Sequence, residues 1–487
     1  MNNPIRTLLF TTAYVTLAAL CLWPGGDTQA QASAAYGKQD DARDAKKIMA
    51  LANAGDAQAQ YRLGVLYENG RGVVKDAQQA VSWYSKAAEQ GLTNAQNSLG
   101  WMYLDGLGVA KNGQVAADWF KKAAEQGNVN AQLKLGWMYE MGQGVPKDVP
   151  QALLWYGKAA ALGNASAQFN LAAMYDIGES VPKDGQQAQL WYGKAAAQGN
   201  TNAQHNLAMM HENGWGIEKN EQLALDWYQK AALLGMADAQ YRLGRMYLDG
   251  RGAAKNGQVA ADWFKKAAEQ GHAHAQVKLG WMYDVGQGVP KDVPQALLWY
   301  DKAAAQGNAN AQYNLGVMYE DGQALEKNEQ LALDWYQKAA VQGMADAQNR
   351  LGWTYLKGRG VAKNGQVAAD WFKKAAEQGH ANSQLKLGNM YDIGEGVSKN
   401  GPQALDWYQK AAVQGMADAQ FHLGRMYLDG RGVAKDGQQA YFWLLLASSV
   451  GDPDAKRHLA TLEKTLTAVQ KNKIEANVKA WKPVTQP

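Results

Sequence analysis

Residues 237–271 read "ADAQYRLGRMYLDGRGAAKNGQVAADWFKKAAEQG", two short helical patterns on either side of a glycine-rich loop. In the first pattern Leu243 and Met246 recur at the spacing of one face of a helix. Gly250 follows, at the place where helices commonly end in a left-handed residue. Asn256 opens the second pattern and is a residue type preferred as a helix N-cap. The stretch therefore predicts a helix, a turn and a second helix.

The same unit recurs along most of the chain. A glutamine returns every 36 residues from Gln60 to Gln420, and a tryptophan does so from Trp83 to Trp443, which makes eleven copies without an insertion. The sixteen letters NGQVAADWFKKAAEQG occur three times unchanged. Self-similarity at a fixed period of this size is typical of stacked helical repeats, in which side chains between neighbouring units form the core.

These observations predict an all-α, right-handed superhelical solenoid. About eleven 36-residue helix-turn-helix repeats are expected over residues 56–451. Residues 33–55 are predicted to form an N-terminal capping helix, and residues 452–487 C-terminal capping helices and a tail. Stacking is expected because a unit of this size falls below the roughly 40 residues that a domain usually needs to stand alone, and the N-terminal cap is expected because "ALANAG" at 50–55 echoes the end of the second helix.

The motif "AQYRLGRMYLDGRG" at 239–252, followed by "AADWFKKAAEQG" at 260–271, resembles the Sel-one-like repeat (SLR) family, relatives of the tetratricopeptide arrays. Ten counterparts in phase extend the resemblance over the repeat region. The resemblance implies an α-solenoid that serves as an adaptor, as family members do in envelope assembly, signalling and host interaction.

Residues 1–32 have the layout of a secretory signal peptide. Arg6 precedes an apolar run from Leu8 to Trp23, and small-residue cleavage patterns end at Ala30 or Ala32. The run is shorter than the roughly 20 residues of a membrane-spanning helix. We expect a bacterial protein that is exported, periplasmic or secreted, with no stable membrane span after cleavage. The one cysteine, Cys21, lies in this segment, so the mature chain would have no disulfides.

The overall charge is nearly balanced, with 49 basic and 45 acidic residues. A nucleic-acid binder held by phosphate contacts needs a concentrated basic face. The composition therefore favours other partners, and no nucleic acid is expected.

Comparing the copies with one another predicts a binding surface. With the recurring glutamine as position 0, positions +3, +6 and +7 of the first helix barely change, whereas +1, +2, +5, +8 and +9 vary and are expected to face away from the core. Aromatic and arginine side chains, the types that dominate interface hot spots, gather there. The candidate partner-binding residues are Tyr61, Trp101, Trp137, Phe169, Tyr241, Arg245, Trp281, Tyr313, Trp353, Phe421 and Arg425. Basic residues at +2 are partly balanced by acidic ones at +8 and +9, so the pattern does not specifically imply a strongly anionic protein or peptide ligand.

The sequence gives little support for a catalytic or metal site. Cysteine-rich SLR relatives have been linked to penicillin binding and β-lactam hydrolysis, and Ser180 and Lys183 form an S-x-x-K string. No S-D-N or K-T-G partner accompanies it. His272 and His274 could share a metal but lack a third ligand at suitable spacing. We therefore expect no catalytic, cofactor-binding or metal site.

Three functions remain open. The leading one is an exported, non-enzymatic scaffold or adaptor that binds a protein through the groove of the solenoid. The alternatives are a hydrolase acting on cell-wall or β-lactam substrates, for which Ser180 is the only candidate, and a carbohydrate-binding module, because Trp and Tyr also stack on sugar rings.

Overall fold

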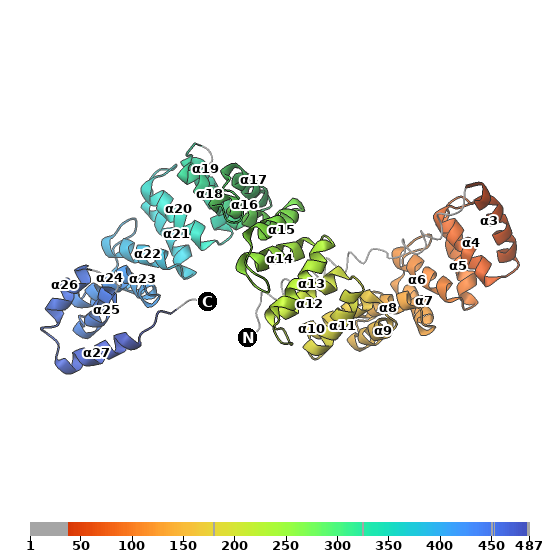
Figure 1. Cartoon of the computed structure of the whole chain (residues 1–487), viewed down its shortest axis with the longest axis horizontal. Helices are drawn as coiled ribbons and strands as arrows, with labels where there is room; N and C mark the ends of the chain where they lie inside the picture. Colours follow the sequence, from red (N-terminus) through yellow and green to blue (C-terminus); the bar gives the residue numbers. More distant parts are fainter. Residues whose placement is uncertain (1–37, 179–180, 324–325, 450, 452, 485–487) are drawn as a thin grey trace. The chain divides into compact units, whose positions relative to one another are not determined.

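A computed structural model describes residues 38–178, 181–323, 326–449, 451 and 453–484, with side chains from residue 44 onward. The predicted signal segment and Ser180 lie outside the described residues. Every regular element in the described part of the chain is an α-helix (Figure 1). The chain divides into two compact units, residues 1–219 and 220–487, and each is considered by itself.

Repeat helices are thirteen residues long in both units. The helices of the first unit are α3 Lys38–Asn53, α4 Ala57–Asn69, α5 Ala77–Glu89, α6 Thr93–Asp105, α7 Gly113–Glu125, α8 Val129–Met141, α9 Val149–Ala161, α10 Ala165–Ile177, α11 Gly185–Ala197 and α12 Thr201–Asn213. Those of the second unit are α13 Glu221–Leu233, α14 Ala237–Asp249, α15 Gly257–Glu269, α16 Ala273–Val285, α17 Val293–Ala305, α18 Ala309–Asp321, α19 Glu329–Val341, α20 Ala345–Lys357, α21 Gly365–Glu377, α22 Ala381–Ile393, α23 Gly401–Val413, α24 Ala417–Asp429, α25 Gly437–Ser449, α26 Pro453–Leu462 and α27 Ala468–Ala480.

Within each unit, consecutive helices pack against one another along the chain. The even-numbered helices α4 to α24 are the first helices of the repeats, called A helices here, and the odd-numbered helices α5 to α25 are the second, or B helices. Within one unit, each B helix packs on the A helix before it and on the A helix after it. The predicted all-helical repeat solenoid is confirmed.

The local signals act as the sequence predicts. Gly250 ends α14 in the left-handed conformation, with φ 74° and ψ 37°. The side chain of Asn256 caps α15 by accepting a hydrogen bond from the backbone N–H of Val259 at 3.1 Å. These two residues fix where the first helix of the repeat ends and the second begins.

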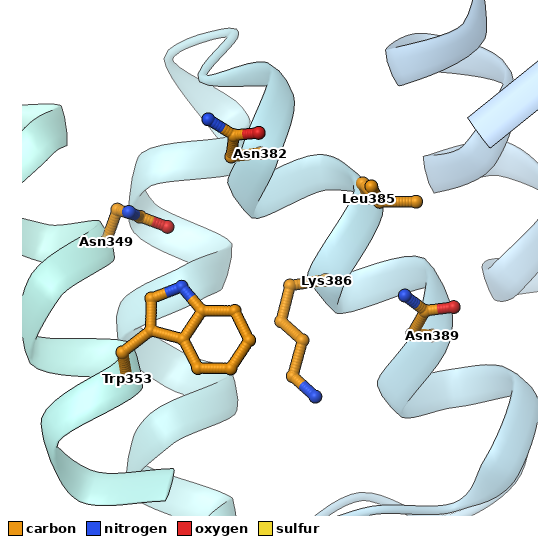
Figure 2. A pocket seen from close by; sticks show the side chains of 6 residues that line it. All are labelled: Asn349, Trp353, Asn382, Leu385, Lys386 and Asn389. Carbon is orange, nitrogen blue, oxygen red and sulfur yellow. The ribbon is translucent and has the colours of Figure 1, made fainter. Parts of the chain in front are cut away.

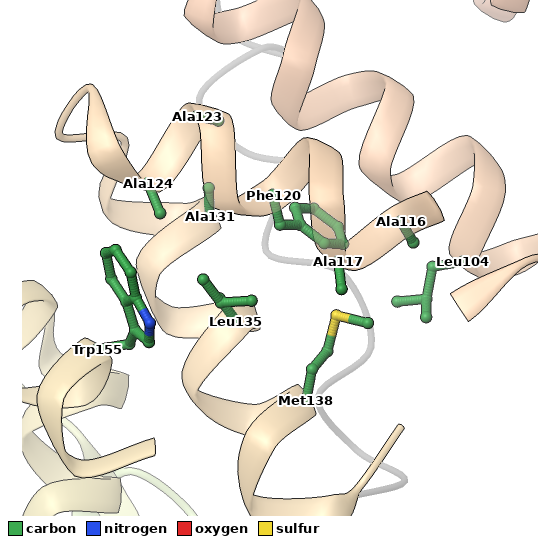
Figure 3. Close-up of a cluster of buried hydrophobic side chains, with 10 residues drawn as sticks. All are labelled: Leu104, Ala116, Ala117, Phe120, Ala123, Ala124, Ala131, Leu135, Met138 and Trp155. Carbon is green, nitrogen blue, oxygen red and sulfur yellow. The ribbon is translucent and has the colours of Figure 1, made fainter. Parts of the chain in front are cut away.

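The core is built from a close approach of the A and B helices. Leu and Met at positions +3 and +6 are buried, whereas the tyrosine at +7, expected on the same face, is half-buried, as at Tyr247. Position +24, on the B helix, carries a large ring such as Phe264 in the first ten repeats, and a glycine, or alanine in two of them, stands at +4 beside it. A Cβ on Gly244 would lie 2.8 Å from the Phe264 ring. Figure 3 shows the corresponding Phe120 among small alanines of α7 and α8.

The recurring glutamine links consecutive repeats. Gln276 is buried, and its Nε2 donates to the carbonyl oxygen of Ala268 at 3.0 Å. Its Oε1 accepts from Gln306 Nε2, thirty residues later, at 2.7 Å. The same pair of bonds joins Gln240 to Ala232 and Gln270. Where leucine stands thirty residues later, as after Gln132 and Gln204, the second bond is absent. The bond to the preceding helix is made in every copy, and it explains why a polar residue repeats without change inside the stack, since an unpaired buried amide nitrogen would be costly.

Additional helices pack against the two ends of the array. On α3, Ile48 and Met49 pack on the first repeat, beside Leu63. At the other end α26 and α27 both pack on α25. After α27 the chain returns toward the tenth repeat, where the Val484 N–H donates to the Val413 carbonyl at 2.8 Å.

Candidate binding surface on the A helices

The A-helix stripe, defined here as positions +1, +2 and +5 of the A helices, contains all eleven predicted partner-binding residues. The structure leaves each of the eleven half-buried. The expectation that they face away from the core is therefore wrong in part. A solenoid A helix packs against B helices on two sides, which buries more of its circumference than a one-sided amphipathic helix would bury.

Aromatic residues at +1 rest on the buried ring of their own repeat. Tyr241 lies 5.8 Å from Phe264 between ring centres, and Tyr313 lies 5.7 Å from Tyr336. Tyr61 and Phe169 make the corresponding contacts with Tyr84 and Tyr192. These aromatic side chains of the stripe therefore contribute to packing within the repeat.

Tryptophans at +5 combine packing with an accessible edge. Trp101 and Trp353 meet Phe120 and Phe372 edge-on, at 5.6 and 5.5 Å. The ammonium of Lys134 lies 4.5 Å from the Trp101 ring centre and 3.7 Å from that of Trp137, so it is held between two indoles. Lys278 lies 5.5 Å from Trp281. Arg425 lies 5.7 Å from the Phe421 ring.

Position +8 was predicted on the outward face, but it points at the ring of the B helix. Glu140 accepts a hydrogen bond from the Tyr156 hydroxyl at 2.7 Å, and Glu320 accepts one from Tyr336 at 2.7 Å. Every repeat with tyrosine at +24 has Asp or Glu at +8, and every repeat with phenylalanine or leucine there has leucine at +8, as Leu104 and Phe120 do. Glu140 and Glu320 therefore bind the buried ring of their repeat, and Glu320 also lies 3.6 Å from Arg350 at +2, so it still neutralises part of the stripe.

Burial is the main cause that raises the pKa of Tyr336 above its ordinary value, followed by the hydrogen bond to Glu320. The same carboxylate also binds the next repeat, because Arg359 Nη1 lies 2.8 Å from Glu320. Arg431 Nη1 likewise lies 2.8 Å from Asp392 Oδ2, in the repeat before its own. Tyrosine, carboxylate and arginine are thus linked at the first of these junctions, and carboxylate and arginine at the second.

Other side chains noted in the sequence have structural roles. His272 is the N-cap of α16, where its Nδ1 accepts from the Ala275 N–H at 3.0 Å, and its Nε2 lies 3.1 Å from Asp238. Among the described residues, no group of three or more His, Cys, Asp or Glu side chains is placed to hold a metal ion. No helix in that part of the chain is long and apolar enough to cross a membrane.

A partly open pocket lies on the stripe in the second unit. It has a volume of about 320 Å³ and opens between the A helices α20 and α22 (Figure 2). Its lining residues are Asn349, Trp353, Asn382, Leu385, Lys386 and Asn389. Only Trp353 among these is a predicted candidate. Sequence reasoning missed the three asparagines, because it weighted aromatic and arginine side chains alone.

The fold and this surface define a class, the α-helical repeat proteins whose A helices present side chains that vary from repeat to repeat. A family model described as Sel1 repeat matches residues 57–92, 93–128, 129–164, 165–200, 201–236, 237–272, 273–308, 309–344, 345–380, 381–416 and 417–452. The chain belongs to the Sel1 repeat family. This fold is typical of protein–protein interaction scaffolds.

Two solved structures are similar over long stretches. The first is c5321, a protective antigen present in uropathogenic Escherichia coli strains that displays an SLR fold. It is 37% identical, with a TM-score of 0.75, and the match covers 90% of this chain and 94% of that one. A Sel1 repeat protein from Oxalobacter formigenes is 33% identical, with a TM-score of 0.54, over 63% of this chain and 89% of that one. No curated protein matches the sequence.

Proposed function

We propose that this protein is an exported, non-enzymatic scaffold that binds a protein or peptide partner along the A-helix stripe. The main support is that variation between repeats gathers at +1 and +5, where half-buried aromatic and basic side chains keep an accessible edge. Such side chains are rigid and already partly desolvated, which lowers the entropic cost of binding.

Export is proposed from the sequence of residues 1–32, which have the layout of a signal peptide. The similar E. coli protein is described as a protective antigen, a description consistent with a protein that leaves the cytoplasm. N-terminal sequencing of the protein from cell fractions and medium tests this proposal. A mature chain that begins near residue 33 is expected, and an intact Met1 in the cytoplasm would contradict it.

The binding face is tested by affinity capture from envelope and secreted fractions with two matched baits. One reverses three charges on the A helices, Lys134, Lys278 and Lys386 to Glu. The other reverses three exposed charges on the B helices, Lys121, Lys265 and Lys373 to Glu. Both carry the same net charge, and circular dichroism checks that both remain helical.

A partner lost from the A-helix bait and kept by the B-helix bait is the expected result. Equal capture by both baits would contradict the assignment of the face. Retention on a polysaccharide gel, or hydrolysis of a β-lactam reporter, would favour one of the two alternative functions instead.

A further inference from the structure

The pocket between α20 and α22 has the size of a small recognition site. Its volume of about 320 Å³ lies at the lower end of the roughly 300–1,000 Å³ found for ligand pockets. Such a space suits one side chain of a partner rather than a large cofactor. In Figure 2 the Trp353 indole faces the Lys386 side chain across it, and the asparagines stand around them.

The same lining recurs elsewhere in the chain. Asn349, Trp353, Asn382, Leu385 and Lys386 correspond to Asn97, Trp101, Asn130, Leu133 and Lys134, each 252 residues earlier, at the junction of the second and third repeats. No other repeat junction in the sequence carries this set of five. The sixth position differs, because Trp137 stands where Asn389 would be. The set of five recurs as a sequence pattern, although Ala131 stands at the earlier junction where Ser383 stands at the later one.

Hydrogen bonds within the protein determine which way two of the asparagines face. Asn349 Oδ1 lies 2.9 Å from the Ser383 hydroxyl, which is also 2.9 Å from His380 Nδ1, and Asn389 Oδ1 accepts from the Tyr408 hydroxyl at 2.5 Å. A carboxamide has one oxygen acceptor and two N–H donors. With both oxygens engaged, each residue turns its Nδ2 donors to a ligand, and no acceptor in the described part of the chain is bonded to either nitrogen.

The charged group of the pocket is also a donor. The Lys386 ammonium lies 5.1 Å from the Trp353 ring centre and 2.8 Å from Glu395 Oε2. Lys386 is 16% exposed and Glu395 34% exposed, so this carboxylate sits at the more open end of the pair. An ammonium has three N–H donors, so it can bind a second carboxylate together with Glu395. Lys357 adds a further positive charge 5.0 Å from the Trp353 ring.

We propose that this pocket binds an Asp or Glu side chain of an extended peptide, with the Trp353 ring against the neighbouring apolar residue of that peptide. A carboxylate only accepts hydrogen bonds, which matches the donors of Asn349, Asn389 and Lys386. Sugar hydroxyls both donate and accept, and the amide oxygens of Asn349 and Asn389, each already accepting one hydrogen bond, have only one lone pair left for a sugar proton. The inference rests on the proposed peptide-binding function and identifies the chemistry of the partner.

The test is an array of acetylated, C-terminally amidated hexapeptides in which two central positions run through all residue types. The array is probed with the fluorescently labelled full chain, and oligomers of N-acetylglucosamine are printed beside the peptides. Peptides with Asp or Glu next to an apolar residue are expected to bind about tenfold better than their Asn or Gln counterparts, because a charge-assisted hydrogen bond is worth about that much.

Two single variants, Asn349→Asp and Asn389→Asp, test the N–H donors of the two side chains one at a time. Each keeps the oxygen that accepts from Ser383 or Tyr408 and removes only the NH₂ group, so folding should be retained. Each is expected to abolish the roughly tenfold preference for acidic peptides and to improve binding of peptides with Lys or Arg. The control is Asn310→Asp, which makes the same charge change at an exposed position outside the pocket.

The possible failures are distinguishable. Peptides that bind without an acidic preference, or a preference that Asn389→Asp does not change, would overturn this inference and leave the proposed function standing. Binding of the sugar oligomers that is lost in the two variants would make the pocket a glycan site and overturn the inference. An array with no bound peptide would contradict both the inference and the proposed function.

Discussion

Replacing the hydroxyl of a single buried tyrosine should reveal how the two helices of a repeat recognise each other. Tyr156, fully buried on α9, donates to Glu140 on α8 at 2.7 Å. A hydrogen bond to a charged group is worth about 1.5–3 kcal/mol, and a buried hydroxyl left without an acceptor costs about 1–3 kcal/mol. Tyr156→Phe and Glu140→Leu should therefore each destabilise the third repeat.

The double variant should be less harmful than the two single variants predict. It converts this pair into the apolar pair of the second repeat, where Leu104 and Phe120 are both buried. The coupling energy between the two sites is expected to be about 0.5–3 kcal/mol.

Hydrogen exchange of α8 and α9, measured by mass spectrometry, reports the free energy of local unfolding of these two helices. A local measurement is needed because neighbouring repeats of an array can unfold separately. Tyr156→Phe should speed exchange about 10- to 150-fold, since each 1.4 kcal/mol is a factor of ten. The same variants should leave the exchange of helices α20 and α21, in the other unit, unchanged. Additive effects in the double variant, or no effect of either single change, would refute the reasoning.

Three further predictions concern stability. A Cβ on Gly316 would lie 2.5 Å from the Tyr336 ring, so Gly316→Val should cost about 1–3 kcal/mol in chemical denaturation; an unchanged midpoint would show that the ring moves freely. Asn256→Ala removes the cap bond to Val259 and should cost about 0.5–2 kcal/mol, with faster exchange at the start of α15 as its signature. Burial raises the pKa of Tyr336, so stability that is present below the unfolded-state pKa of about 10 should be lost as the pH rises above it. Tyr336→Phe should make this alkaline loss less steep, and an identical pH profile would argue against it.

The helices, their boundaries and their number could be predicted because the determining signals are local. Gly250 and Asn256 act within one turn of the chain and need no distant partner. The period of 36 residues then extends the result from one repeat to all eleven. The secondary structure of even a short unit can be assigned when its pattern recurs in eleven copies.

The burial of the A-helix stripe could not be predicted in the same way. A helical wheel assumes one buried face, whereas position +8 reaches a ring sixteen residues later, as Glu140 reaches Tyr156. The signal was present in the sequence, since every copy that has tyrosine at +24 has an acidic residue at +8. The pocket asparagines were missed for a different reason, because their orientation depends on Ser383 and Tyr408, which belong to other turns and helices.

The claim that the A helices carry the partner is tested most directly by photo-crosslinking in the producing cells. A benzophenone amino acid is introduced, one position at a time, at the exposed stripe residues Arg62 and Arg350 and at the exposed B-helix residues Lys121 and Lys265. The account predicts a discrete protein adduct from Arg62 or Arg350 and none from the two lysine positions. Adducts confined to the B-helix positions, or no protein adduct from any of the four, would contradict it.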